Sequence, residues 1–117
     1  SRSLRLPEPD SVKVLGGWER LAAIVAKIEP LKLKANFGLF GTAIAATWLD
    51  AQTQSAAKFF VEEDRNRIGR THLGRPILAP EDLPFQATVF VALPQPLAGQ
   101  VAERLARLER GLHIVLP

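Results

Sequence analysis

The sequence contains no cysteine, no methionine and no tyrosine, and it has only two histidines, His72 and His113. Without cysteine, neither a disulfide framework nor a Cys-ligated metal site can form. Two histidines so far apart in the chain argue against a zinc site, so we expect no bound metal. No apolar run reaches the length of about 18 residues that a membrane span needs, so we expect neither a membrane span nor a signal peptide. We therefore expect a cytoplasmic protein without a membrane partner.

The missing methionines include the initiator, because the chain begins with Ser-Arg-Ser. We therefore expect these residues to be a piece of a longer protein, which leaves room for a catalytic part elsewhere. Apolar residues make up 47% and charged residues 23% of the chain, which is ordinary for one soluble globular domain. The net charge of +3 is mild and does not imply a nucleic-acid partner.

Two segments precede the first predicted strand. Residues 1–15 are rich in proline and charge, and we expect them to form a linker or arm, with the domain itself over 16–117. Apolar residues then recur at helical spacing, which predicts a helix from Trp18 to Glu29 that Pro30 ends. We expect this extra N-terminal helix to cover one face or edge of a sheet.

The chain is organised around a predicted strand near 36–40, a tight turn at Gly41 and a helix from about 42 to 52. In a doubly wound α/β fold this unit places a helix N-terminus against a phosphate, with the fingerprint G-x-G-x-x-G/A. Here Gly41 allows the turn and Ala46 lets helix and strand approach closely. Ala43, however, puts a methyl group where a pyrophosphate needs bare backbone. The pattern therefore indicates the architecture and argues against dinucleotide binding.

A second strand is predicted at 58–61, and an acidic run that begins with Glu62 follows it. This acid comes about twenty residues after Gly41, and in nucleotide-binding folds an acid at that place accepts hydrogen bonds from a ribose. The alternative is that the acids only form a solvated strand end. Both interpretations stay open, and Glu62 is the better candidate because it is the first acid after the strand.

No long periodic element is predicted from 65 to 84, so the helix of a second crossover is missing there. Arginines gather in this segment, namely Arg65, Arg67, Arg70 and Arg75. Beside a ligand crevice they could hold a phosphate or a carboxylate, and Arg65 is a candidate for that role. Arginines interleaved with acids are more often a solvated loop that neutralises its own charge.

The clearest predicted strand is 87–93, which is β-branched and apolar throughout. A helix follows Pro94-Gln95-Pro96, and a last short strand is predicted at 113–116. Right-handed crossovers then predict a small three-layer α/β fold with a parallel sheet of about four strands in the order 2-1-3-4. Its switch point lies between the strands that end at Phe40 and Leu93, so we expect a ligand just outside those ends. The predicted lining is Gly41, Thr42, Ala43, Leu93, Pro94 and Gln95, with Glu62 at the margin.

Two runs of the sequence, FVEEDRNRIG at 60–69 and LGRPILAPEDL at 73–83, resemble a recurring pattern of known domains. The pattern occurs in small Rossmann-like domains at the C-terminus of bacterial SAM-dependent methyltransferases, including sugar C-methyltransferases. A related run opens sugar O- and N-acyltransferases, where the domain grips a nucleotide-sugar. The resemblance covers about residues 35–116. Arg65 stands where the pattern usually has Pro, and Glu62 where it usually has Asp.

The resemblance implies a Rossmann-like accessory domain that binds a nucleotide or sugar-nucleotide, or positions the substrate, for a methyltransferase. SAM would then be bound by a separate upstream domain, which is the expected protein partner, and this chain would hold no cofactor. The sequence shows no nucleophile together with a base and an orienting group, so we do not expect catalysis by the chain alone.

Two alternatives stay open. The domain could be an interaction or dimerisation module with a vestigial nucleotide crevice, which would make a homodimer or dock to a neighbouring domain. It could also be a small NAD-dependent oxidoreductase, against which Ala43 and the small size of the chain argue.

Overall fold

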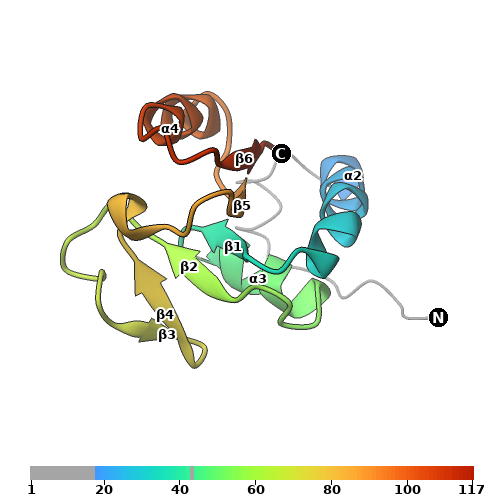
Figure 1. The fold of residues 1–117 in the computed structure, drawn as a ribbon. Coiled ribbons are helices and arrows are strands. Elements are labelled where there is room, and N and C mark those ends of the chain that lie inside the picture. The colour runs from blue at the N-terminus through green and yellow to red at the C-terminus, as the bar shows by residue number, and fades with distance from the viewer. Residues whose placement is uncertain (1–17, 43) are drawn as a thin grey trace.

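The computed structural model describes residues 18–42 and 44–117, so the predicted arm at 1–15 and the predicted site residue Ala43 lie outside the described residues. Figure 1 shows how the elements are arranged. In chain order they are α2 (Trp18–Ile28), the 3-10 helix η1 (Glu29–Leu33), β1 (Phe37–Phe40), α3 (Ile44–Gln52), β2 (Phe59–Val61), β3 (Thr71–His72), β4 (Arg75–Leu78), the 3-10 helix η2 (Pro80–Asp82), β5 (Thr88–Val91), α4 (Leu97–Ala106) and β6 (His113–Val115).

The described strands form one sheet in the order β3-β4-β2-β1-β5-β6. All of the neighbouring pairs are parallel except β3 and β4, which are antiparallel. β1 lies inside the sheet, where Phe40 is opposite Val61 of β2 and Val91 of β5. The C-terminal ends of these three strands therefore meet at one edge of the sheet.

The prediction of about four parallel strands in the order 2-1-3-4 was wrong in the strand count and in the order of the whole sheet. The predicted strands are neighbours as β2-β1-β5-β6, but a hairpin of β3 and β4 extends the sheet beyond β2. Leu73 and Gly74 connect the hairpin strands, and their φ angles are +52° and +79°. Two successive residues with positive φ make the tight turn that matches the twist of paired strands. The sequence did not reveal β3 because two residues are too few to show alternation.

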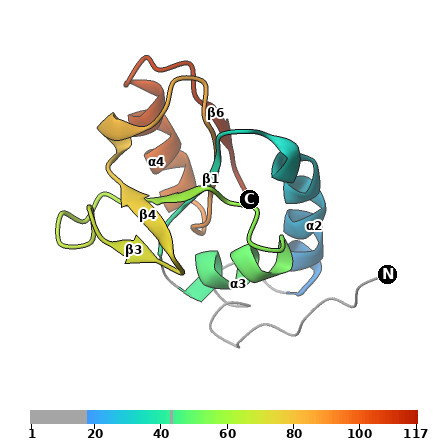
Figure 2. The same cartoon turned by 60° about the horizontal axis from the view of Figure 1, so that its bottom comes forward.

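Helices cover both faces of the sheet, and Figure 2 shows α4 on one side and α2 and α3 on the other. α2 and α3 pack into one core, in which Ile24 and Leu49 are buried together with Phe90 of β5. α4 packs into the second core, where Val101 and Leu105 are buried. The described chain is therefore a small α/β fold with helices on both faces of a mixed sheet, which confirms only the α/β part of the predicted fold class.

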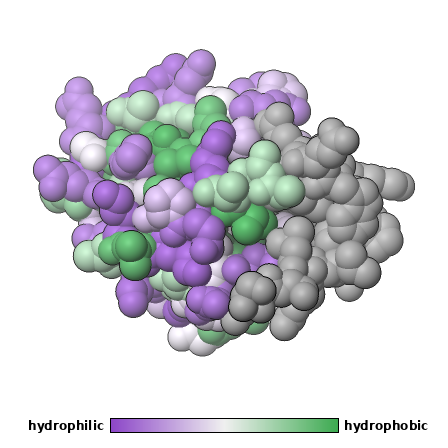
Figure 3. All heavy atoms as spheres, turned by 90° about the vertical axis from the view of Figure 1, so that its right-hand side faces the viewer, coloured by the Kyte–Doolittle hydropathy of each residue, from purple (hydrophilic) through white to green (hydrophobic). Residues whose placement is uncertain are grey.

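Over the part of the chain that the structure describes, few large apolar side chains are exposed. Figure 3 shows the face at the right of Figure 1, where apolar groups are small and lie between hydrophilic ones. Among the described residues, the exposed large hydrophobic side chains are Leu33, Leu73, Phe85 and Leu97. The described helices include none that is both long enough and apolar enough to cross a bilayer.

Candidate functional site

A cleft of about 310 Å³ lies where the C-terminal ends of β1, β2 and β5 meet. The next strand in the chain, β2, lies on one side of β1, and the later strand β5 lies on its other side. The cleft is therefore at the point where the strand order reverses. Open α/β sheets bind ligands at such a switch, because the connections that leave the strands diverge there. The lining residues are Phe40, Gly41, Thr42, Glu62, Glu63, Arg67, Leu93, Leu97, Val101 and Arg104.

Gly41 makes the turn that leads from β1 toward α3. Its φ is +111°, a backbone conformation that a side chain would strain, so glycine is needed here for its conformation. Space is not the reason, because an added Cβ would lie 3.9 Å from Cβ of Ala46, an ordinary contact. The N–H of Gly41 donates to the carbonyl of Val61 at 2.8 Å. This turn therefore shapes the cleft while its own N–H is used to hold β1 beside β2.

Glu62 lies directly after β2, and its carboxylate is held from two directions. The Thr42 hydroxyl donates to Oε2 at 3.0 Å, and the backbone N–H of Glu63 donates to Oε1 at 3.2 Å. The Arg67 guanidinium donates to the Thr42 hydroxyl oxygen at 2.8 Å, and its Nη1 lies 3.8 Å from Oε2 of Glu62. The Glu62 side chain is only 16% exposed. The carboxylate is therefore fixed in position at the wall of the cleft.

Glu63 pairs with Arg104, which reaches the cleft from α4. The guanidinium donates from Nε to Oε2 at 2.8 Å and from Nη2 to Oε1 at 2.7 Å, which is a two-point contact. The hydrogen bonds to Glu63 raise the pKa of the Arg104 guanidinium above its ordinary value, so the group stays charged. The pair connects the end of β2 with α4 across the cleft.

The charges of the cleft balance one another. Glu62 and Glu63 supply two carboxylates to the lining, and Arg67 and Arg104 supply two guanidiniums. Asp64 adds a further carboxylate beside Arg67, with Oδ2 at 3.6 Å from Nε. The cleft thus offers hydrogen-bond donors and acceptors without an excess of positive charge.

Apolar side chains also line the cleft, among them Leu93, Leu97 and Val101. The Leu97 side chain is 50% exposed. α4 begins at Leu97, so this first side chain lies at the rim of the cleft and not over the sheet. The buried residues of α4 are Ala98, Val101 and Leu105.

Three of the predicted site residues, Gly41, Thr42 and Glu62, line the cleft, and so does Leu93. Arg65 does not, because its guanidinium donates to Oε2 of Glu81 at 2.7 Å on the exposed surface.

Pro94 and Gln95 also lie outside the lining of the cleft. The Gln95 side chain accepts the N–H of Gly99 at 3.1 Å, and the carbonyl of Pro94 accepts the N–H of Ala98 at 3.0 Å. Both residues therefore satisfy N–H groups in the first turn of α4, which would otherwise have no partner within the helix.

Glu63 and Arg104 line the cleft but were not predicted as site residues, and Arg67 lies where Arg65 was expected. One signal was available for α4: Leu97, Val101 and Arg104 are spaced four and three residues apart, which places them on one side of a helix. No comparable signal separates Arg65 from Arg67, because both lie in the same loop among the same acids. Only the path of that loop brings Arg67 to Thr42.

The cleft lining holds one hydroxyl group, that of Thr42, in contact with the Glu62 carboxylate, and neither histidine belongs to the lining. His72 lies on β3, where its Nε2 is 3.0 Å from the Thr47 hydroxyl and its ring packs edge-on against Phe60. Over 18–42 and 44–117, no group of three or more His, Asp or Glu side chains is placed to hold a metal ion.

The chain matches no family of known proteins, no curated protein and no solved structure.

Proposed function

We propose that this chain is an accessory ligand-binding domain that takes a nucleotide or sugar-nucleotide ligand in the cleft. The observation that carries the proposal is the Glu62 carboxylate, held by Thr42 beside Arg67 at the switch point of a parallel sheet. An ionised carboxylate has about four lone-pair sites, so hydroxyl groups of a ligand find free acceptors even after the two internal hydrogen bonds. An acid at the end of this strand is placed to accept hydrogen bonds from a sugar hydroxyl.

The wider role rests on the sequence resemblance. We propose that an upstream domain of the same protein binds SAM and transfers the methyl group, while this domain holds or positions the substrate. No cofactor is assigned to this chain itself, and its cytoplasmic location stays a prediction from the sequence.

A second candidate function is an interaction module with a vestigial crevice. This function is favoured because charged groups of the cleft already pair with each other, as Arg104 does with Glu63 through two hydrogen bonds. The exposed Leu97 at the rim would then contact another protein surface, either of a neighbouring domain or of a second copy in a homodimer.

Titration of the isotope-labelled chain with UDP- and dTDP-sugars tests the proposal by NMR. We expect amide shifts at Thr42, Glu62 and Glu63, with dissociation constants in the high-micromolar to millimolar range, or about −4 to −6 kcal/mol. Glu62→Gln should weaken binding by about tenfold, because a hydrogen bond to a charged group contributes about 1.5–3 kcal/mol.

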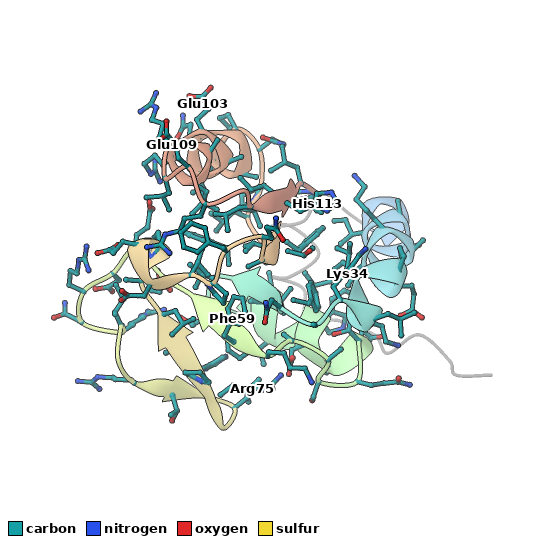
Figure 4. All side chains as sticks on the ribbon, viewed as in Figure 1. Lys34, Phe59, Arg75, Glu103, Glu109 and His113 are labelled. Carbon is teal, nitrogen blue, oxygen red and sulfur yellow. The ribbon has the colours of Figure 1, made fainter. Side chains whose placement is uncertain are left out.

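Glu103→Gln is the matched control, since Figure 4 shows Glu103 on α4 pointing away from the sheet. The control variant should bind like the parent chain. Absence of shifts at the cleft with every nucleotide-sugar would reject the proposal and leave the interaction module as the better function.

A further inference from the structure

We infer that the cleft recognises a neutral, hydroxyl-bearing sugar ring and leaves the phosphates of the ligand outside. This inference rests on the proposed function and specifies which part of the ligand occupies the site. The chemical class is a polyol ring, either the ribose of a nucleoside or the hexose attached to the diphosphate. Charge, backbone hydrogen bonding, side-chain capacity and size each support it.

The charge of the lining disfavours a phosphate. A diphosphate needs an excess of cations, but the carboxylates of Glu62 and Glu63 match the guanidiniums of Arg67 and Arg104. Asp64 beside Arg67 makes the surroundings still more negative. An incoming phosphate would have to compete with carboxylates that are already in contact, whereas a neutral hydroxyl meets no such repulsion.

Three backbone N–H groups at this edge already have partners within the protein. The N–H of Gly41 donates to Val61, and the N–H of Glu62 donates to the carbonyl of Leu78 at 3.0 Å. The N–H of Glu63 donates to the side chain of Glu62. These three N–H groups, all from residues that line the cleft, are therefore consumed within the protein.

The side chains, in contrast, keep capacity for hydroxyl groups. An arginine has five N–H donors, and Arg104 uses two of them on Glu63 while Arg67 uses one on Thr42. The carboxylates of Glu62 and Glu63 also keep free lone pairs. Each lies beside a guanidinium with unused N–H donors, Arg67 for Glu62 and Arg104 for Glu63. A sugar hydroxyl both donates and accepts, and it can therefore bond to a carboxylate and to the neighbouring guanidinium at once.

The volume and the apolar lining residues of the cleft fit a single sugar ring. A volume of about 310 Å³ is at the lower end of ligand pockets, which span about 300–1,000 Å³ for drug-sized molecules. Leu97, exposed at the rim, offers an apolar surface for the C–H face of a sugar, and Leu93 and Val101 continue it.

NMR titrations of the whole chain with matched probes test the inference. The probes are UDP-glucose, uridine, 2′,3′-dideoxyuridine, methyl glucoside and inorganic diphosphate. We expect UDP-glucose to bind, together with either uridine or methyl glucoside, and to shift the same amides at Thr42, Glu62 and Glu63. If uridine binds and dideoxyuridine does not, the ring in the cleft is the ribose. If methyl glucoside binds, the ring in the cleft is the hexose. Inorganic diphosphate should cause no shifts at these residues.

Arg104→Gln provides the second measurement, with Arg107→Gln, at the C-cap of the same helix, as the control. Loss of Arg104 should lower the affinity for UDP-glucose and for the neutral probe that binds, uridine or methyl glucoside, by the same factor of about fivefold to tenfold. Loss of Arg107 should lower neither affinity. Competition by inorganic diphosphate, with no binding of either neutral probe, would overturn the inference while the proposed function stands. If UDP-glucose itself does not bind, the proposed function fails and the inference fails with it.

Discussion

Arg75 and Asp50 form a buried two-point ion pair that fastens the β3–β4 hairpin to α3. Nη1 and Nη2 of Arg75 each donate to a different carboxylate oxygen of Asp50 at 2.6 Å, and Asp50 is only 2% exposed. The guanidinium also donates to the carbonyl of Ala57 at 3.0 Å and lies 5.1 Å from the ring centroid of Phe60. Figure 4 shows Arg75 at the β3–β4 hairpin, where it is the first residue of β4. The pair thus positions the hairpin and the loop before it, from which Arg67 reaches the cleft.

Asp50→Ala should destabilise the chain strongly. Arg75 would keep its charge with only 18% of its side chain exposed, and removing one partner of a buried pair costs about 3–5 kcal/mol. The free energy of unfolding, measured by urea denaturation, should fall by that amount. Glu81→Ala is the control, because it breaks the exposed pair with Arg65 and should leave the denaturation midpoint almost unchanged. Equal losses in the two variants would contradict the role given to Arg75.

Gly38→Ala should destabilise the sheet, because the added methyl group would overlap the ring of Phe59. Gly38 is opposite Phe59 in the parallel pair of β1 and β2, and an added Cβ would overlap the Phe59 ring. Forcing an extra methyl group into a packed core costs about 1–3 kcal/mol. In a double-mutant cycle, Phe59→Leu should make room, so the double variant should lose less stability than the sum of the single variants. Simple additivity would show that the ring is not the obstacle.

The pKa of Glu81 should lie below its ordinary value of 4.5, chiefly because its carboxylate accepts a hydrogen bond from Arg65. A folded-state pKa below the unfolded one means that this contact stabilises the fold fully above the unfolded pKa. The contribution is lost as the pH falls through the folded pKa, so the effect is confined to acid conditions. A carbon-detected NMR titration should give a midpoint below 4.5 for Glu81, and Arg65→Met should raise it. An unchanged midpoint in the variant would exclude Arg65 as the cause.

Thr42→Val should weaken ligand binding at the cleft, and Thr42→Ser should not. The Thr42 hydroxyl donates to Glu62 and accepts from Arg67, so valine removes both contacts while serine keeps them. We expect valine to lower the affinity for a nucleotide-sugar by about fivefold to tenfold, which corresponds to about 1 kcal/mol. Calorimetric titration of both variants provides the measurement. Equal affinities would show that the position of the Glu62 carboxylate does not depend on Thr42.

Much of the framework could be predicted from local patterns. The buried strands are short runs of apolar or β-branched residues, as in 87–93. The first helix was predicted to end at Glu29; α2 ends at Ile28, and a 3-10 helix that contains Pro30 continues to Leu33. Gly41 and Glu62 were also predictable, because a glycine turn and an acid after a strand are local features. These signals depend only on the spacing of neighbouring residues, so the sequence by itself determined the α/β class and the strand ends at which the cleft lies.

The tertiary structure alone decided the hairpin and the pairing of charges. Arg65 and Arg67 have the same chemistry in the same loop, yet one contacts Glu81 at the surface and the other contacts Thr42 at the cleft. Arg104 meets Glu63 from 41 residues away. Whether two such groups meet depends on the packing of whole elements against each other, and a charge in the sequence carries no information about its distant partner.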